Sequence, residues 1–341
     1  MSADSLVGGA VYDKLAPGTQ AFLDTVLGDT VGGVVTTTSL AGGGVLVTGT
    51  GSGGVQQGAV IAGNVPVAGE LTEGQFVLTI GLPPGLTAAF EGPGAPSTPA
   101  EANAYVRSII DAAFPANSAD VSVQNERASL INSIDALTKS LTANFGAPTE
   151  VLVRVVALTD ISSASAKVIG TEEVVFESTG QAGANPELMV FVMSALSPNK
   201  TLVLKGVEAA LIAGSGTVRI DGDRAGFLAG DVANQALVGG GGNDTLMGGG
   251  GNDTLTGGVG NDVFALSALQ GNLTITDFDV AHDKLVFNIP GINGIADAAL
   301  HFTGLTQDAG SSTLHFDTGS SVTLVGVTPD ELVLGMLKFT L

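Results

Sequence analysis

The chain has 341 residues, a formal net charge of −21 and no cysteine. Its acidity argues against nucleic acid and anionic membranes as partners, and the lack of cysteine excludes disulfide bonds and thiol nucleophiles. Glycine or polar residues interrupt each apolar run before about 18 residues, so the chain is not expected to span a membrane. The length is sufficient for two or three domains.

Residues 1–220 are expected to form a mostly β, sandwich-like assembly or functional domain with a two-helix insertion. The helices are predicted at about 99–114 and 125–144, with Ser97 or Thr98 as the cap of the first. One face of the second helix is apolar through Leu130, Ile131, Ile134, Leu137 and Leu141. The predicted strands are Val31–Thr37, Val45–Thr48, Ala59–Ile61, Gln75–Ile80, Glu150–Leu158, Ala166–Glu177, Leu188–Met193, Leu202–Leu204 and Val218–Ile220.

Three consecutive nonapeptides in residues 239–265 read GGGGNDTLM, GGGGNDTLT and GGVGNDVFA. Each fits G-G-x-G-x-D-x-U-x, in which U is a large apolar residue. A glycine-rich turn that ends in Asp and leads into a short apolar strand, repeated every nine residues, is typical of a calcium-binding parallel β-roll. The alternative is a flexible linker, which has no reason to keep an apolar residue at each ninth position.

The expected cofactor is Ca²⁺, because positive φ at glycine lets carbonyls converge and calcium prefers about six to eight oxygen ligands. Zinc and copper do not suit a repeat without Cys or His. The predicted ligands are the backbone of the first four turn positions and the three aspartates: Gly239, Gly240, Gly241, Gly242, Asp244, Gly248, Gly249, Gly250, Gly251, Asp253, Gly257, Gly258, Val259, Gly260 and Asp262.

Two nonapeptides make one turn of such a roll, so alternate turns stack on the same edge. Asp244 and Asp262 are therefore predicted to share one well-formed calcium site. The turn 248–253 has neighbours with Gln235 and Gly271 at the Asp position, so one or two further sites are expected to be partial. Asp231, or the downstream Asp277 and Asp279, are candidates for an extra oxygen ligand on that edge.

The apolar position of the repeat continues beyond the three full copies and predicts a six-rung roll. The next position upstream, Arg219, is not apolar and ends the series. The members, nine residues apart, are Leu228, Leu237, Leu246, Leu255, Phe264 and Leu273. The roll is assigned to residues 221–275, and residues 276–341 to a C-terminal β cap. The fold class is thus mainly β: a sandwich-like domain, a short parallel β-roll and a β cap.

These repeats resemble those of the RTX (repeats in toxin) proteins, and the resemblance covers roughly residues 221–341. The segment Leu273–Phe287, LTITDFDVAHDKLVF, is similar to the one that commonly follows RTX repeats. The alternating strands Leu300–Phe302, Thr313–Phe316 and Ser321–Val325 resemble the family's cap. The apolar end, Leu337–Leu341, is similar to uncleaved C-terminal secretion signals.

The resemblance implies export from a Gram-negative cell by a type I secretion machinery, to the extracellular space or the cell surface. The N-terminus, MSADSLVGGAVYDKL, has neither the basic nor the apolar region of a secretory signal peptide, which agrees with this route. Calcium binding to a site that exists only in the folded chain contributes directly to folding. We therefore expect the chain to leave the cell unfolded and to fold outside on binding calcium.

An enzyme of a familiar kind is not expected. The only histidines are His282, His301 and His315, and the chain contains neither H-E-x-x-H nor G-x-S-x-G. The segment Gly49–Gly54 matches G-x-G-x-x-G, but the glycine-rich sequence after it favours a loop between strands over a nucleotide site. No catalytic residue is assigned.

Two clusters of acidic residues have both a structural and a functional interpretation. Glu172, Glu173 and Glu177 are interpreted as a solvated strand face, because a sugar-cleaving carboxylate pair would need aromatic platforms that this chain lacks. Asp221 and Asp223 are interpreted as part of a turn at the entry to the roll, with a calcium-ligand role as the alternative.

Three functions remain in consideration. The favoured one is a secreted structural protein that self-assembles at the cell surface, since the composition resembles that of surface-layer subunits. Its expected partners are further copies of itself in an oligomer or lattice and the type I machinery, with a cell-surface polysaccharide as a further candidate. The alternatives are an RTX adhesin or binding module and a secreted enzyme with an unrecognised active site.

Overall fold

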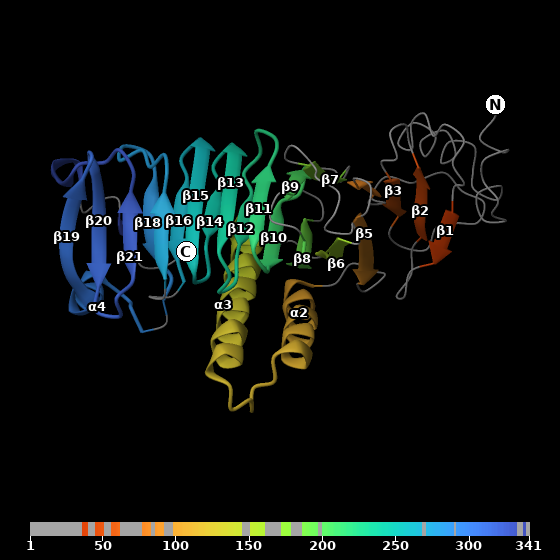
Figure 1. Ribbon diagram of the computed structural model, residues 1–341, viewed down its shortest axis with the longest axis horizontal. Helices are drawn as coiled ribbons and strands as arrows, with labels where there is room; N and C mark the ends of the chain where they lie inside the picture. Colours follow the sequence, from red (N-terminus) through yellow and green to blue (C-terminus); the bar gives the residue numbers. More distant parts are fainter. Residues whose placement is uncertain are drawn as a thin grey trace.

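The computed structural model describes two β-sheets and a helical hairpin (Figure 1). Among the described residues one sheet has thirteen strands and the other has nine; they are called the first and the second sheet. The described residues are 36–39, 45–50, 56–61, 77–82, 86–91, 98–144, 151–160, 172–178, 186–196, 200–267, 271–289, 291–332 and 337–338.

A parallel β-roll forms most of both sheets. Successive strands alternate between the sheets, and each pairs in parallel with the strand one full turn away. In the first sheet these strands are β7 (Glu172–Ser178), β9 (Lys200–Lys205), β11 (Gly216–Ile220), β13 (Gln235–Gly241), β15 (Asn252–Val259), β17 (Asn272–Ile275) and β21 (Ser321–Leu324). In the second sheet they are β6 (Leu152–Asp160), β8 (Glu187–Ala195), β10 (Ala209–Ala213), β12 (Phe227–Ala229), β14 (Thr245–Met247), β16 (Val263–Leu266), β18 (Lys284–Phe287) and β22 (Leu337–Lys338).

Two ladders of buried apolar side chains fill the space between the sheets. Each rung of the roll contributes one inward-facing residue to each ladder, and burial of these side chains is the main stabilising contribution to the roll. The nine-residue apolar period is confirmed from Leu228 to Phe264. The ladders are Leu202, Val218, Leu237, Leu255, Ile275 and Leu324 in the first sheet, and Met189, Ala210, Leu228, Leu246, Phe264 and Leu285 in the second.

The predicted series is wrong at both ends. Leu255 pairs with Ile275 and not with Leu273, because the connection between β16 and β17 is two residues longer than in the other repeats. Leu273 lies opposite Asp253 and is only partly buried. Upstream, the ladder does not end at Arg219: the residue before it, Val218, pairs with Leu237 and continues inward.

The parallel roll is longer than the expected residues 221–275. Parallel pairing begins at β6 and β7 and reaches β21 and β22, with no interruption near residue 220. The upstream strands stack like the repeats, but their connecting turns differ in length and composition, so the nine-residue period is absent from their sequence. The functional division at residue 220 stays a prediction.

The N-terminal strands continue the same two sheets in antiparallel order. β4 pairs with β7 in the first sheet, and β5 pairs with β6 in the second. The N-terminal strands, which were expected to form a sandwich-like domain, therefore pair with the strands of the roll and extend its two sheets. β5 and β10 were not among the predicted strands. The N-terminal strands are β1 (Thr36–Ser39), β2 (Val45–Thr50), β3 (Gln56–Ile61), β4 (Val77–Leu82) and β5 (Leu86–Glu91).

The two predicted helices are present as α2 (Pro99–Ala113) and α3 (Val121–Asn144). Thr98 caps α2: its hydroxyl accepts a hydrogen bond from Glu101 N–H at 3.3 Å, and Glu101 Oε2 accepts one from Thr98 N–H at 2.9 Å. Helix α3 starts before the predicted residue 125, because Asp120 Oδ1 accepts a hydrogen bond from Ser122 N–H at 2.8 Å.

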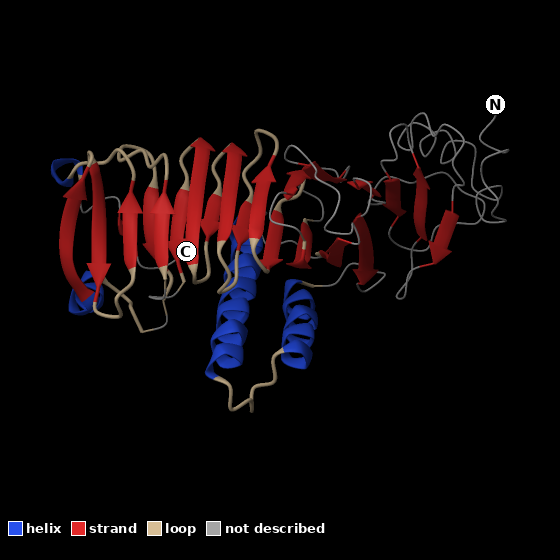
Figure 2. Ribbon diagram, viewed as in Figure 1, coloured by secondary structure: helices blue, strands red, loops and turns tan. Residues whose placement is uncertain are grey.

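The helical hairpin packs on the outer face of the second sheet. Its loop points away from the roll, while α3 lies against β10 and β12 (Figures 1 and 2). The predicted apolar face of α3 is buried there, since Ile134 and Leu137 are fully inaccessible. The strands supply the matching residues Val153, Val190 and Leu211. No helix in the described ranges is long and apolar enough to cross a membrane.

The C-terminal cap follows β18. It comprises α4 (Ile295–His301), the antiparallel strands β19 (Phe302–Asp308) and β20 (Ser311–Phe316), and a short 3-10 helix at Pro329–Glu331. β20 pairs antiparallel with β21, and β21 returns the chain to the parallel roll beside β17. The predicted β cap is thus confirmed, with β19 as the last strand of the first sheet.

Candidate calcium-binding site

The turns of the roll stack along two opposite edges. The first edge carries the turns 221–226, 239–244, 257–262 and 277–283, which lead from the first sheet into the second. The second edge carries the turns 230–235 and 248–253 and the connection that begins at Ser267. The predicted stacking of alternate turns follows from the strand register: residues 18 apart in β12, β14 and β16 pair directly.

On the first edge, the aspartates form a hydrogen-bonded column. Asp244 Oδ1 accepts a hydrogen bond from Gly226 N–H at 2.7 Å, and Asp262 Oδ1 accepts one from Asp244 N–H at 2.8 Å. Asp283 Oδ1 accepts one from Asp262 N–H, also at 2.8 Å. Each carboxylate therefore caps the corresponding residue of the preceding rung, and the second oxygen of Asp244 has no hydrogen-bond partner.

These carboxyl groups are buried, which makes their charged form unfavourable without a cation. Asp244 is 0% exposed, and its Oδ2 is buried with no hydrogen-bond partner. Desolvation, together with the nearby Asp262, raises the pKa of Asp244 to about 7. Desolvation also raises the pKa of Asp262, with further contributions from Asp283 and Asp277. An unpaired buried carboxylate of this kind calls for a positively charged partner.

Backbone carbonyls point into the same gap. A Cβ added to Gly239 would lie 2.6 Å from both Asp244 Oδ2 and the carbonyl oxygen of Gly257. Gly258 and Gly260 have positive φ, and a side chain on either would overlap the carbonyl oxygen of Gly240 or Gly242. Only glycine therefore fits between the stacked turns, which brings carbonyl and carboxylate oxygens together.

The composition of this site suits calcium. In the described ranges no three His, Cys, Asp or Glu side chains gather into one potential metal site, so carbonyls must supply most of the ligands. Calcium accepts a mixture of carbonyls and a few carboxylates in flexible geometry. Asp244 and Asp262 with the turn carbonyls fit this requirement, and these residues would hold the ion.

Asp277 and Asp279 lie on the first edge, not beside the turn 248–253 as considered from the sequence. Asp277 accepts hydrogen bonds from Gly257 N–H at 2.9 Å and Gly258 N–H at 2.8 Å. Asp279 N–H donates to Asp283 Oδ2 at 2.8 Å. The strand β17 shifts by two residues, and the following turn therefore completes the aspartate column instead of the opposite edge.

The aspartates of the second edge have different hydrogen-bond partners from those of the first edge. Asp253 Oδ1 accepts a hydrogen bond from Gln235 N–H at 2.9 Å, which confirms Gln235 at the Asp position of the neighbouring turn. On the downstream side the residue opposite Asp253 is Leu273 instead of the expected Gly271. Asp231 lies in this edge and accepts hydrogen bonds from Gly214 N–H at 2.6 Å and from the Gln235 side chain.

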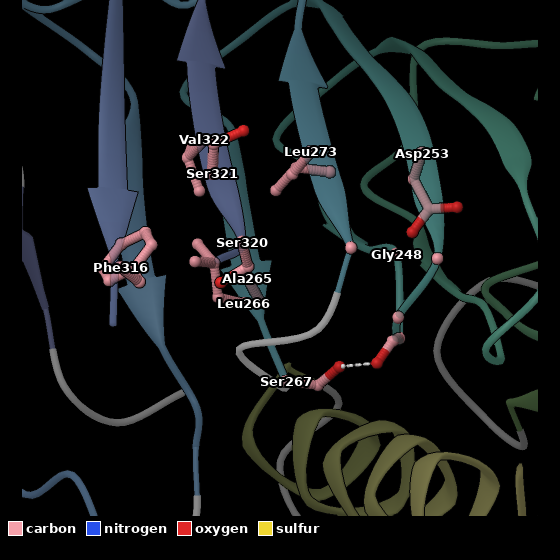
Figure 3. Close-up of a pocket in the computed structure, with 14 residues that line it drawn as sticks. Gly248, Asp253, Ala265, Leu266, Ser267, Leu273, Phe316, Ser320, Ser321 and Val322 are labelled. Atoms are coloured by element: carbon pink, nitrogen blue, oxygen red, sulfur yellow. Dashed lines mark hydrogen bonds between the residues drawn. The ribbon is translucent and has the colours of Figure 1, made fainter. Parts of the chain in front are cut away.

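A small cavity of about 30 Å³ lies between turn 248–253 and the cap (Figure 3). Asp253 lies at one side of it, and Phe316 and Ser320 lie at the other. Ser267 Oγ donates a hydrogen bond to the carbonyl oxygen of Gly249 at 3.0 Å. The Gly249 carbonyl, which a cation on the second edge would need as a ligand, is therefore already hydrogen-bonded to this hydroxyl group.

Helix α3 covers further acceptors of the second edge. Ser133 Oγ donates to the carbonyl oxygen of Gly230 at 2.8 Å, and Asn132 Nδ2 donates to that of Ser267 at 2.9 Å. Desolvation raises the pKa of Asp253 to about 8, with Asp231 as a further cause. Side-chain donors thus satisfy several carbonyls of the second edge. On the first edge, the described donors to Asp244, Asp262 and Asp283 are backbone N–H groups.

The remaining candidates make polar contacts with neighbouring side chains. All three histidines contact polar neighbours in the cap region: His282 contacts Asp279, His301 contacts Asp317, and His315 contacts Thr306. Glu173 and Glu177 are exposed, and Glu173 pairs with Arg219 at 3.0 Å, which agrees with a solvated strand face.

The glycine-rich segment 49–54 begins with Gly49 and Thr50 at the end of β2, and residues 51–54 lie outside the described residues. β2 pairs antiparallel with β3, so a strand stands at residues 56–61, where a nucleotide site would require a helix. The pair Asp221 and Asp223 lies in a turn, as predicted. Gly222, between them, accepts a hydrogen bond through its carbonyl from Gly241 N–H at 2.9 Å.

Comparisons with known proteins agree with the roll. Residues 230–265 match the family model of the RTX calcium-binding nonapeptide repeat (4 copies). This range adds the nonapeptide 230–238, with Gln235 at the Asp position, to the three found by inspection. No curated protein matches the chain.

A solved structure with local similarity is the extracellular lipase LipA from Serratia marcescens, at 16% sequence identity and a TM-score of 0.22. The match covers 46% of this chain and 40% of the lipase chain. The family match and the strand pairing, taken together, show that the chain carries RTX calcium-binding nonapeptide repeats within a parallel β-roll.

Proposed function

We propose that this protein is a secreted structural subunit that folds outside a Gram-negative cell on binding calcium and then self-assembles at the cell surface. The coarser part of this statement, a secreted calcium-binding RTX-type protein, rests on the repeats. The observation that carries the calcium dependence is the column of buried aspartates on the first edge, in which Asp244 Oδ2 has no partner.

Calcium would act as the switch for folding. The ligands of a site between turns 239–244 and 257–262 come together only when the rungs stack, so binding energy adds to folding energy. Extracellular modules typically bind calcium with a Kd of about 10⁻⁴–10⁻³ M, far above cytosolic calcium. The calcium-binding rungs of the roll would thus stay open in the cytosol, which suits passage through a type I machinery, and close outside.

Self-assembly is supported by the end of the first sheet. β19 is the last strand of that sheet, and among the described strands it has no partner on its outer side. Phe302 and Leu305 on this strand, and Leu300 just before it, are exposed large apolar side chains. An exposed strand edge with apolar side chains is suited to pairing with another chain. A second copy is the partner that a surface lattice requires.

Electron microscopy of the purified protein with millimolar calcium tests this proposal. We expect ordered sheets or filaments that disappear on chelation. Thr306→Pro and Leu305→Lys, both on β19, should prevent assembly while calcium-dependent folding by circular dichroism is retained. Val121→Lys changes another exposed apolar residue, at the start of α3, and serves as the control.

Persistent monomers at high calcium would contradict self-assembly. Monomers that bind a cell-surface polysaccharide would favour the adhesin alternative, and turnover of an extracellular substrate would favour the enzyme. If the β19 substitutions leave assembly unchanged, the protein still forms a lattice, but the edge of β19 is not the contact between its copies.

A further inference from the structure

The aspartate column of the first edge extends into rungs that carry no nonapeptide. In the second sheet, Leu188, Ala209 and Phe227 occupy equivalent positions in successive strands, and Phe227 is in turn equivalent to Thr245. The residue before each of these belongs to the column. In chain order the column is Glu187, Glu208, Gly226, Asp244, Asp262 and Asp283.

The upstream carboxylates make the same contact as the aspartates. Glu208 Oε2 accepts a hydrogen bond from Glu187 N–H at 3.4 Å, one rung back. This is the arrangement by which Asp262 Oδ1 accepts from Asp244 N–H at 2.8 Å. The longer glutamate side chains therefore occupy the Asp positions of two rungs upstream of residue 226. Glu187 is 1% exposed, so its charge is as buried as that of the aspartates.

The two parts of the column differ in their counter-ions. Arg154 Nε on β6 lies 3.7 Å from Glu187 Oε1, and both side chains are buried. The two groups form an ion pair without a hydrogen bond, so Arg154 compensates the charge of Glu187 electrostatically. Arg224 Nη1 lies 3.8 Å from Glu208 Oε1 at the surface. In contrast, no Lys, Arg or His of the described residues forms an ion pair with Asp244, Asp262 or Asp283. In the described part of the chain, Glu187 and Glu208 of the column thus have an arginine partner, and Asp244, Asp262 and Asp283 do not.

We propose that Arg154 is a built-in counter-ion that takes the place of calcium at the upstream end of the carboxylate column. The rungs from β6 to β10 then fold without calcium, and the rungs from β12 to β18 require it. This inference rests on the calcium-dependent folding in the proposed function and is independent of self-assembly.

The position of Arg154 in the strand supports this role. Arg154 pairs with Met189, which belongs to the inward-facing ladder of the second sheet. Its guanidinium is therefore directed to the interior, where arginine keeps its charge, since its pKa is too high for deprotonation. A buried carboxylate beside a permanent cation has no need of a metal, whereas one without such a partner needs a cation from outside.

The consequence is a defined order of folding. In a stack whose units contact only their neighbours, an already folded rung provides the edge on which the next can form. β10 would provide this edge for β12, and α3, which packs on both strands, would be anchored before calcium arrives. Low calcium alone would then leave residues 152–213 able to fold, so rapid export has to precede the folding of this part.

Hydrogen exchange of the full-length protein, measured by mass spectrometry with millimolar calcium and with chelator, tests the inference. In chelator we expect peptides from 187–195 and 209–213 to stay protected. Peptides from 245–247 and 263–266 should lose protection by at least about 100-fold, since the energy of calcium binding is withdrawn from them. Loss of protection in both groups of peptides would overturn the role of Arg154 but leave calcium-dependent folding in place. Equal protection in both conditions would overturn it together with calcium-dependent folding.

Substitutions assign the effect to the ion pair. Arg154→Met should lower the protection of 187–195 in chelator by about 100-fold, because it leaves a buried carboxylate unpaired. The double variant Arg154→Gln with Glu187→Gln removes both charges and should regain most of this loss. Arg219→Ala, which removes an arginine paired with exposed Glu173, is the control and should not change it. No difference between Arg154→Met and the control, or no recovery in the double variant, would overturn the proposal.

Discussion

At the scale of single residues, the buried aspartates are governed by burial and mutual repulsion. Asp244 and Asp262 lie on the first edge without a counter-ion among the described residues, while Asp253 on the second edge has the carboxyl group of Asp231 nearby. Proton and calcium therefore compete for the same oxygens, since a ligating carboxylate has to be deprotonated.

This competition predicts opposite pH dependences with and without calcium. The pKa values of Asp244 and Asp253, about 7 and about 8, lie above the ordinary value of 3.8, so the calcium-free folded roll binds more protons than the unfolded chain. The stabilisation is complete below the unfolded pKa and is lost as pH rises through about 7 to 8. Thermal melts in chelator should therefore show higher stability at pH 5 than at pH 8, and saturating calcium should reverse this order. Parallel curves in both conditions would contradict the assignment.

A second prediction separates the two edges. Asp262→Asn removes a carboxylate that caps Asp244 and faces the candidate site, so calcium affinity measured by calorimetry should fall at least about tenfold. Asp253→Asn changes the same group on the second edge, where hydrogen-bond donors replace the cation, and should affect calcium affinity less. Equal losses for the two variants would show that both edges bind calcium equally well.

At the scale of elements, the stacked turns depend on backbone that only glycine allows. Gly258 has φ of +96°, and a Cβ there would overlap the carbonyl oxygen of Gly240. Gly310 has φ of +81° with nothing within 4 Å of an added Cβ. Gly258→Ala should therefore destabilise the calcium-bound protein by about 3 kcal/mol or more, and Gly310→Ala by only about 1–2 kcal/mol. Similar unfolding free energies in denaturant titrations would show that the turns relax.

The contact of α3 with the second edge gives a further prediction. Ser133 is fully buried and its hydroxyl donates to the Gly230 carbonyl, so Ser133→Ala should cost about 1–3 kcal/mol by leaving that acceptor unsatisfied. Thr142→Ala removes an exposed hydroxyl that bonds only within the helix and should change stability by less than about 0.5 kcal/mol. Both are measured by urea unfolding in calcium, and a silent Ser133→Ala would mean that water replaces the hydroxyl.

At the scale of the whole molecule, a net charge of −21 opposes compaction, but the charges that matter for calcium are the buried ones. Millimolar Ca²⁺ should therefore restore the β-sheet signal of a chelated sample in circular dichroism. Equal Mg²⁺ should not, because Mg²⁺ requires near-ideal octahedral geometry and retains its water. Sodium chloride should restore little, since salt screens buried charges poorly. Full recovery with Mg²⁺ would indicate general charge neutralisation in place of a calcium site.

The repeat itself could be predicted because its period is uninterrupted. Leu228 to Phe264 recur every nine residues, and the structure places all of them in the two ladders. The prediction fails at Leu273, where a longer connection shifts the register and Ile275 takes the inward position. The upstream rungs escaped detection for the same reason: Val218 and Leu202 pair as ladder members although 16 residues separate them. Strands can pair although the turns between them differ in length, whereas a search for a fixed nine-residue period misses such rungs.

The sequence by itself determined the nonapeptide roll, its preference for calcium and the two helices, because local spacing and backbone preference specify each of them. Tertiary structure decided which carboxylates share an edge. Asp277 and Asp283 join the column of Asp244, and Glu187 meets Arg154, 33 residues earlier in the chain. These neighbours are set by the register of whole strands, which depends on every turn between them, so no local pattern records them.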